Sequence, residues 1–364
     1  MQGSLNNKKA WVGFDGFVDK LVVPVKLRKG GGNAFEGFKT LTEFGKKIQT
    51  ASQSNLNIEL YLKQEKLGGN GPLLANTLAN LGVKVHYVGT LGKPIHPVFE
   101  AFAQNIEVTT LGAFGETQAL EFSDGKLLLG HTSPMEAVTY QGLIEVISET
   151  NLMSQFSQSD LICFQNWTML LHLSEIFENI LENIWPGLSE NKERICFFDL
   201  ADPAKRTRED CRHLLELLPK FQSKSHVYLG VNRSEIRFIG KLLGKPEPPY
   251  RLETESYAVW VKEIKDCLQI NGLIVHCSEG AVADCMGEIA FVPALKARCL
   301  SCLTGSGDHF NGGFLGGVLM HLSLAQCLQL GHITSVLYIE KGHTPSKEQV
   351  SMLWNEVYKG KELE

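Results

Sequence analysis

The residues best suited to chemistry lie together in one glycine-rich segment near the C-terminal end of the chain, Leu303 to Phe314. Gly305, Ser306 and Gly307 are small and directly precede a helical pattern that begins at Asp308. Glycine lets the backbone approach a ligand closely, and the free N–H groups at a helix start favour an anion such as phosphate. A carboxylate in the first helical turn is stabilised as the anion, and beside a phosphate it can take a proton from an attacking hydroxyl. The segment therefore predicts a phosphate-binding loop with Asp308 as a general base, although on this segment alone a helix-capping role is an equal alternative.

Two common nucleotide-binding motifs do not fit this segment. No Gly-Lys-Ser/Thr follows any glycine cluster in the chain, which excludes a Walker A loop. The dinucleotide fingerprint opens a βαβ unit and has an acidic residue about 20 positions further on, whereas this loop lies near the C-terminus. The phosphate site must therefore be of another kind.

Two segments in the N-terminal third carry candidate binding residues. One is a short polar stretch before the helical pattern at 73–81, and it contains Gly68, Gly69 and Asn70. A glycine pair before a helix is by itself more often a turn than a site. The other segment contains Asp19, whose carboxylate can accept bonds from two hydroxyls. It also contains Asp15, which turn chemistry around Gly16 explains at least as well.

Asn232 and Glu235 form a further candidate site, because they follow one predicted strand and open a predicted helix. A capping box, with Asn232 as N-cap and Glu235 at the third helical position, explains the pair in structural terms. One carboxylate is also chemically sufficient to organise Mg²⁺, which keeps much of its water shell. The sequence allows both roles at once.

The elements that must position these residues follow a regular alternation. Apolar runs of strand length occur at 10–14, 83–89, 161–164, 195–200, 226–231 and 272–276. Helical patterns lie between and after them, at 73–81, 171–184, 207–218, 234–243, 257–269 and 308–322. This order predicts an α/β sheet covered by helices on both faces. Asn166, Asp199 and Asp202 come at the ends of strands, where ligands of such sheets collect, but a turn role is equally well supported.

Two regions break the alternation and predict a second, smaller sheet. Strand patterns occur at 20–26 and 58–64, and a hairpin pattern joins 116–122 to 126–129 around a Ser-Asp-Gly turn. The strands of this sheet are thus expected within 20–66 and 116–130. The stretch 28–57 opens with three glycines and continues into an amphipathic pattern at 38–48, so a loop and a helix are expected as an insertion in the sheet.

Composition excludes several classes of protein. The chain has 364 residues, 43% of them hydrophobic, and its net charge of −5 makes nucleic acid an unsuitable partner. Its apolar runs are far shorter than the ~20 residues of a membrane span, and the polar N-terminal stretch has no export signal, so a cytoplasmic protein is expected. Nine scattered cysteines indicate reduced thiols, and the lone Cys299/Cys302 pair lacks the second pair that a zinc site needs.

Together these motifs resemble the PfkB, or ribokinase-like, family of carbohydrate kinases, from about residue 10 to about residue 357. The C-terminal loop with Asp308 is similar to the family's C-terminal signature, 67–72 to its Gly-Gly motif, and 232–235 to its Asn-x-x-Glu motif. The resemblance implies a ribokinase-like three-layer sandwich with a mainly parallel central sheet and a small β-sheet lid, in one domain over 1–364. A homodimer through the lid is one expectation.

The resemblance also implies roles for the candidate residues. Asp308 would be the base that activates a sugar hydroxyl, and Gly305, Ser306 and Gly307 would form an anion hole for the phosphoryl group. Asp19, Gly68, Gly69 and Asn70 would bind the sugar. Asn232 and Glu235 would serve ATP and Mg²⁺, with Glu235 acting through water, and Ser278 and Gly280 would belong to the nucleotide loop. The expected activity is ATP-dependent phosphorylation of a sugar or sugar-like molecule.

The sequence departs from the family at four places. Leu73 stands where many members carry a sugar-binding asparagine, and Asn70 where ribokinases carry a lysine. The segment 276–280 is shorter than the usual nucleotide loop, and Cys302 replaces an acid that helps to bind an alkali cation, so that cation site is expected to be weak or absent. A nucleoside or other small alcohol therefore remains an alternative substrate, and a non-catalytic binding protein an alternative function.

Overall fold

The computed structural model of the chain describes residues 5–52, 54–189 and 193–361. Its main sheet has nine strands: β1 (Lys9–Phe14), β5 (Lys84–Gly89), β6 (Glu107–Thr110), β9 (Leu161–Gln165), β10 (Ile195–Asp199), β11 (His226–Asn232), β12 (Gly272–His276), β13 (Gly280–Cys285) and β14 (Glu288–Pro293). Their order is β14-β13-β12-β11-β10-β9-β1-β5-β6. The strands from β12 to β6 are parallel, and only β13 and β14 are antiparallel to their neighbours. The predicted, mainly parallel α/β sheet is confirmed.

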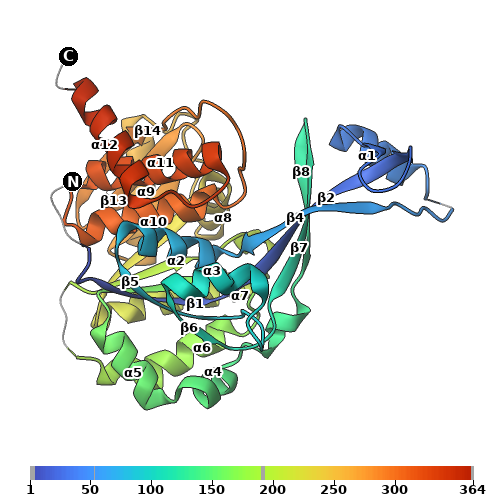
Figure 1. Ribbon diagram of the computed structural model, residues 1–364. Coiled ribbons are helices and arrows are strands. Elements are labelled where there is room, and N and C mark those ends of the chain that lie inside the picture. Colours follow the sequence, from blue (N-terminus) through green and yellow to red (C-terminus); the bar gives the residue numbers. More distant parts are fainter. Residues whose placement is uncertain (1–4, 53, 190–192, 362–364) are drawn as a thin grey trace.

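Side chains alternate along each central strand between two buried cores, one on either face of the sheet. In β10, Cys196 and Phe198 belong to one core, and Ile195 and Phe197 to the other. The first core is covered by α4 (Tyr140–Ile147), α5 (Glu149–Gln158), α6 (Leu173–Asn179), α7 (Arg208–Leu217), α8 (Arg233–Leu242) and α9 (Glu255–Leu268). The second core is covered by α2 (Asn70–Leu81), α3 (Glu100–Asn105), α10 (Ser306–Leu319), α11 (Leu324–Lys341) and α12 (Lys347–Lys361). These are the three layers of Figure 1.

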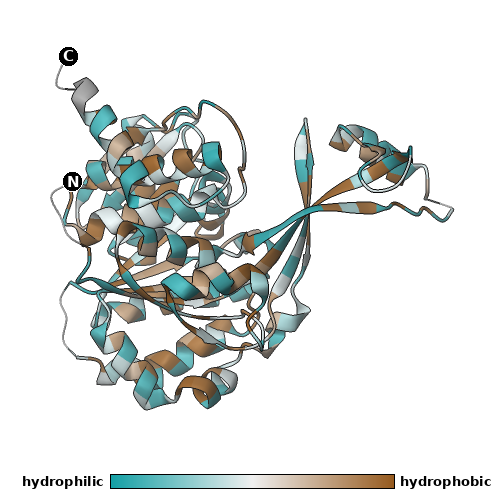
Figure 2. Ribbon diagram, in the orientation of Figure 1, coloured by the Kyte–Doolittle hydropathy of each residue, from teal (hydrophilic) through white to brown (hydrophobic). Residues whose placement is uncertain are grey.

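The flanking helices carry both hydrophobic and hydrophilic residues, as expected of helices that bury one face (Figure 2). Their boundaries differ from the predicted ones at specific places. The helix predicted at 171–184 is regular only as α6, and continues as a π-helical turn, Ile180–Ile184, before Pro186. Proline has no N–H to donate to the carbonyl oxygen four residues earlier, which explains why the helical segment ends near Ile184. Within the described residues, no helix has the length and apolarity that a membrane crossing requires.

The second sheet is longer than predicted. It consists of β2 (Phe17–Arg28), β3 (Phe35–Gly37), β4 (Leu60–Gly68), β7 (Gly115–Phe122) and β8 (Gly125–His131), with order β3-β2-β7-β8 and β4 paired to β2. The strands extend one to three residues beyond the expected ranges 20–66 and 116–130. The largest difference is at the start of β2, which begins directly after the turn that follows β1. The outer part of the sheet projects away from the main body and carries α1 (Leu41–Gln49) at its far end (Figure 1).

The insertion at 28–57 contains the expected helix and also β3, which was not predicted. The helix begins at Leu41 rather than Phe38, since the Thr40 side chain accepts the N–H of Glu43 as an N-cap. Phe38 packs against Phe44, and together with Val22 and Leu120 these rings form a separate small core. The apolar pattern at 38–48 thus reflected a hydrophobic cluster as well as a helix.

Candidate active site

The glycine-rich loop lies at the N-terminus of α10. Gly305 is the residue before the helix and has a φ of 90°, a left-handed conformation that favours glycine. A Cβ atom at Gly305 would lie 2.5 Å from Cδ1 of Leu73, so the position also has no space for a side chain. Ser306, Gly307 and Asp308 then form the first helical turn, where backbone N–H groups have no partner within the helix.

Glycines within α10 let the helix pack closely on its two neighbours. A Cβ atom at Gly312 would be 2.7 Å from Cβ of Thr77 in α2, and one at Gly313 would be 2.2 Å from Oγ1 of Thr334 in α11. The Phe-Asn-Gly-Gly-Phe part of the motif therefore has a packing role. This close packing places the N-terminus of α2 beside that of α10, and so Asn70 beside Asp308.

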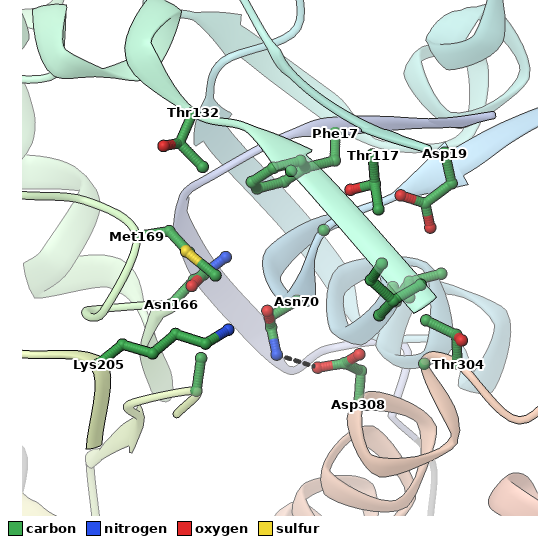
Figure 3. A pocket seen from close by; sticks show the side chains of 16 residues that line it. Phe17, Asp19, Asn70, Thr117, Thr132, Asn166, Met169, Lys205, Thr304 and Asp308 are labelled. Carbon is green, nitrogen blue, oxygen red and sulfur yellow. Dashed lines mark hydrogen bonds between the residues drawn. The ribbon is translucent and has the colours of Figure 1, made fainter. Parts of the chain in front are cut away.

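Asp308 is the centre of the site. Its side chain is 7% exposed, and the Nδ2 of Asn70 donates a hydrogen bond of 2.9 Å to its Oδ1 (Figure 3). Burial raises the pKa of Asp308 well above its ordinary value, the negative charges of Asp199 and Asp15 raise it further, and the bond from Asn70 opposes them. A carboxyl group with a raised pKa is a stronger base than a free aspartate, which suits proton abstraction from a hydroxyl.

A pocket of about 290 Å³ lies above Asp308, between the main body and the second sheet. It includes five of the predicted site residues: Asp19, Gly69, Asn70, Gly305 and Asp308. Other lining residues are Phe17, Leu73, Thr117, Leu128, Gly130, Thr132, Asn166, Met169, Ala201, Lys205 and Thr304. In Figure 3, Asp19 and Thr117 lie on one side of the pocket and Lys205 and Met169 on another, with Asn70 and Asp308 between them. The volume is near the lower end of the roughly 300–1,000 Å³ found for small-molecule sites.

Asp19 comes from β2 of the second sheet and is 8% exposed. Gly68 lies on the paired strand β4 and leaves space for the Asp19 carboxyl group. A Cβ atom at Gly68 would lie only 2.4 Å from Cγ of Asp19. Burial raises the pKa of Asp19, and a hydrogen bond from Thr117 and the charges of Lys66 and Lys126 oppose this shift. Gly68 thus supports the site by making room for Asp19, whereas Gly69 reaches the pocket itself.

A second group of predicted residues adjoins the first turn of α10 at the ends of β11 and β12. Asn232 caps α8 through bonds to the N–H groups of Ser234 and Glu235, and Glu235 Oε2 accepts the N–H of Asn232 at 2.8 Å. The capping box is therefore present. His276 is paired with Asn232, and its ring lies against Gly307, so His276 connects this group to the glycine loop.

Glu235 is also placed to attract a cation. Burial raises its pKa to about 8, with further contributions from the charges of Asp199 and Asp202. A buried carboxyl beside two further acids fits a bound Mg²⁺, because the charge of the ion would favour the ionised forms. In the part of the chain that the structure describes, no three His, Cys, Asp or Glu side chains form a metal-binding cluster. The residues therefore fit a magnesium ion that keeps water and phosphate oxygens as most of its ligands, and not a cation held by the protein alone.

Ser278 and Gly280 lie apart from the pocket. Ser278 is in the turn between β12 and β13, where its hydroxyl donates to Glu279, and Gly280 is the first residue of β13. A Cβ atom at Gly280 would be 2.7 Å from the Val292 carbonyl oxygen, which gives this glycine a packing reason. The antiparallel hairpin β13–β14 was not among the predicted strands.

The structure also places the residues whose roles were left open. Asn166 lines the pocket, Asp199 is buried and accepts from Asn311 Nδ2 at 2.9 Å, and Asp202 is half-exposed beside Lys205. Turn chemistry alone does not explain Asp15, because its carboxylate is fully buried and accepts hydrogen bonds from residues 55 to 151 positions away.

Two lysines of the second sheet were missed. Lys66 Nζ donates to Cys302 Sγ at 2.9 Å, and Lys126 Nζ donates to Thr304 Oγ1 at 2.8 Å. Both contacts reach the residues just before Gly305. Lys66 stands opposite Asp19 in the β2–β4 pairing, so the strand register is the signal that would have identified it.

Comparisons with known proteins agree with this geometry. A family model described as prokaryotic ketohexokinase matches residues 1–357. The chain is 25% identical to a ketohexokinase of Haloferax volcanii over 342 residues, which cover 93% of this chain and 88% of that protein. Its fold is similar to that of an Arabidopsis thaliana ribokinase solved with ribose and ATP, at a TM-score of 0.64 and 16% identity over 95% of this chain and 98% of that one. It is also similar to a Burkholderia thailandensis nucleoside kinase solved with inosine, at a TM-score of 0.61 and 17% identity over 94% and 96% of the two chains.

Proposed function

The chain belongs to the prokaryotic ketohexokinase family of sugar kinases, and from this premise we propose that it transfers the γ-phosphoryl group of ATP to a hydroxyl of a ketohexose. The observation that carries the proposal is the position of Asp308. It lies in the first turn of α10, directly after the glycine loop, and faces the same pocket as Asp19 and Asn70. A base, an anion-binding helix start and polar groups for a polyol thus meet at one place.

In this reaction Asp308 takes the proton of the sugar hydroxyl as its oxygen forms a bond to the γ-phosphorus. The bond between that phosphorus and the β–γ bridging oxygen breaks, and ADP leaves. The N–H groups of Gly305, Ser306 and Gly307 stabilise the negative charge of the transferred group, helped by the N-terminal end of the α10 dipole. Phosphoryl transfer depends mainly on positioning and electrostatics, so the rigid packing of α10 against α2 is part of the catalytic arrangement.

Sugar binding is assigned to both halves of the pocket. Asp19 supplies carboxylate oxygens from the second sheet, and Asn70 and the Gly69 backbone supply groups from the main body. Asn232, with Ser278 and Gly280 beyond it, is assigned to the nucleotide side. Glu235 would hold Mg²⁺ through water, and the ion would neutralise phosphate charge there.

The test is a panel of acceptors supplied with ATP and Mg²⁺, with ADP release as the readout. Ketohexoses, aldohexoses, pentoses and nucleosides are compared at equal concentration, and Asp308→Asn is the inactive control. We expect the highest kcat/KM for a ketohexose. A preference for nucleosides would overturn the substrate assignment, and specific binding of a sugar without any ADP release would favour a non-catalytic binding protein.

A further inference from the structure

Asp15 is the most completely buried carboxylate near the pocket, and the proposed reaction does not use it. It follows β1, and its side chain is 0% exposed. Oδ2 accepts the backbone N–H of Asn70 at 2.9 Å and Nδ2 of Asn166 at 2.7 Å, and Oδ1 accepts the backbone N–H of Gly71 at 2.8 Å. The carboxylate therefore joins the end of β1 to the start of α2 and to the residue after β9.

The three partners explain why this position needs an acid. All of them are donors, so the group between them must accept only, as an ionised carboxylate does. Burial raises the pKa of Asp15, and the three donors oppose that shift. The anion also lies at the N-terminus of α2, where the helix dipole stabilises it. An amide of the same size would turn its NH₂ group towards at least one of these donors.

The glycines of the 68–71 stretch make this close approach possible. A Cβ atom at Gly71 would lie 2.7 Å from Oδ1 of Asp15, and one at Gly69 would lie 3.1 Å from Oδ2. Gly69 also has a φ of 95°. The backbone is thus shaped around the Asp15 carboxylate as well as around the pocket.

Asn70 connects this carboxylate to the catalytic base. Its backbone N–H bonds to Asp15, and its side-chain Nδ2 bonds to Asp308. Asn166 joins Asp15 to β10 instead, because its side chain donates to Asp15 while its backbone N–H donates to the carbonyl oxygen of Asp199. Asn70 therefore connects the carboxylates of Asp15 and Asp308 through two hydrogen bonds.

We propose that Asp15 is a positioning residue: it fixes the first turn of α2 so that Asn70 holds the Asp308 carboxylate in the orientation required for proton abstraction. The inference rests on the proposed sugar kinase function. Asp15 itself does not line the pocket. Its effect on the rate is transmitted through Asn70.

A double-mutant cycle tests this transmission. Asp15→Asn, Asn70→Ala and the double variant are compared with the wild type, using the best acceptor found in the panel. We expect each single variant to lower kcat about 10- to 100-fold, the size of effect known for small displacements of reacting groups, with KM for ATP unchanged. The double variant should have a kcat within about threefold of Asn70→Ala, since the two residues act along one path.

Asp284→Asn is the matched control. Asp284 is also fully buried and bonded, to Lys265 at 2.8 Å, but it lies in β13 away from the pocket. This variant should melt at a lower temperature and keep the kcat of the folded enzyme. Melting curves of all variants separate loss of folded protein from loss of turnover.

Several outcomes would overturn the inference. If the Asp15 and Asn70 effects multiply in the double variant, Asp15 does not act through Asn70. If Asp15→Asn does not fold, Asn70→Ala still tests the inference, because a wild-type kcat in that variant would show that Asp15 cannot act on the base through Asn70. A wild-type chain that phosphorylates no acceptor would instead contradict the proposed function, so the two failures are distinguishable.

Discussion

The two halves of the pocket are built differently. The main body contributes Asp308 and Asn70 from helices whose apolar faces are buried against a nine-stranded sheet. The second sheet contributes Asp19 and Thr117 from strands whose own core is small, and Leu62, Leu128 and Leu129 on this sheet are exposed by 43–49%. Figure 1 shows the contrast between the layered body and the projecting sheet.

Polar contacts show the same contrast. In the main body, buried bonds between carboxylates and amides hold the groups around Asp308, including Asp15 with Asn166 and Asp199 with Asn311. The second sheet reaches the glycine loop through the ends of two long side chains, Lys66 and Lys126. Because long flexible side chains adapt more readily than buried backbone, we propose that the main body carries out the chemistry, and that the second sheet closes over the pocket and adds Asp19 to the groups that bind the sugar.

The largest expected effect lies in the main body. Asp308→Asn removes the base and should lower kcat about 10²- to 10⁴-fold, while sugar binding persists. Steady-state kinetics and calorimetric sugar titration measure the two properties. Asp210→Asn, a change of a half-exposed aspartate on α7 that pairs with Arg206 away from the reacting groups, is the control and should keep the wild-type kcat. Full activity of the Asp308 variant would break the assignment of chemistry to this half.

An Asp→Asn substitution in the second sheet should weaken sugar binding and leave turnover almost unchanged. Asp19→Asn weakens bonds between a charged acceptor and sugar hydroxyls, each worth about 1.5–3 kcal/mol, so KM for the sugar should rise about 10- to 100-fold with little change in kcat. Asp124→Asn, in the β7–β8 turn of the same sheet, is the matched control. A kcat loss comparable to that of Asp308→Asn would show that the two halves do not divide the work in this way.

A smaller effect is expected at Glu235. Glu235→Gln should raise the Mg²⁺ concentration required for half-maximal rate several-fold, because the amide has no charge for the hydrated ion. The melting temperature should change little, since Gln can still complete the capping box with Asn232. Magnesium titrations of activity and thermal melts provide both values. An identical magnesium curve for variant and wild type would leave Glu235 with the capping role alone.

The smallest effect is expected from alkali cations. Cys302 Sγ contacts the Lys66 ammonium at 2.9 Å and the Tyr338 hydroxyl at 3.4 Å, and a thiol is a poor ligand for a hard cation. Tyr338 also donates to the Thr304 carbonyl oxygen at 2.8 Å, which holds the loop without an ion. Activity should be nearly equal in potassium, sodium or a bulky organic cation at fixed ionic strength. Several-fold activation by potassium alone would contradict this prediction.

Much of the fold could be predicted from the sequence, because the patterns that indicate strands and helices are local. Strand and helix patterns depend on periods of about 2 and 3.6 residues, and the segment 272–276 was predicted with the boundaries of β12. The hairpin β13–β14 was missed, since Ala281 to Ala283 are all buried and show no alternation. The helix at 38–48 was placed three residues early at its N-terminal end because Phe38 is apolar for a tertiary reason.

The sequence by itself determined the chemistry available at Gly305 to Asp308, since a glycine turn followed by a carboxylate in a first helical turn is a local arrangement. Only the tertiary structure decided what surrounds that carboxylate. Asn70 lies 238 positions from Asp308, and Lys66 lies 236 positions from Cys302. The hydrogen-bond partners of Asp15 could not be predicted for the same reason. The groups that donate to its carboxylate belong to α2 and to the end of β9. A hydrogen bond joins two atoms about 3 Å apart, and it cannot be predicted from sequence spacing when its residues lie so far apart along the chain.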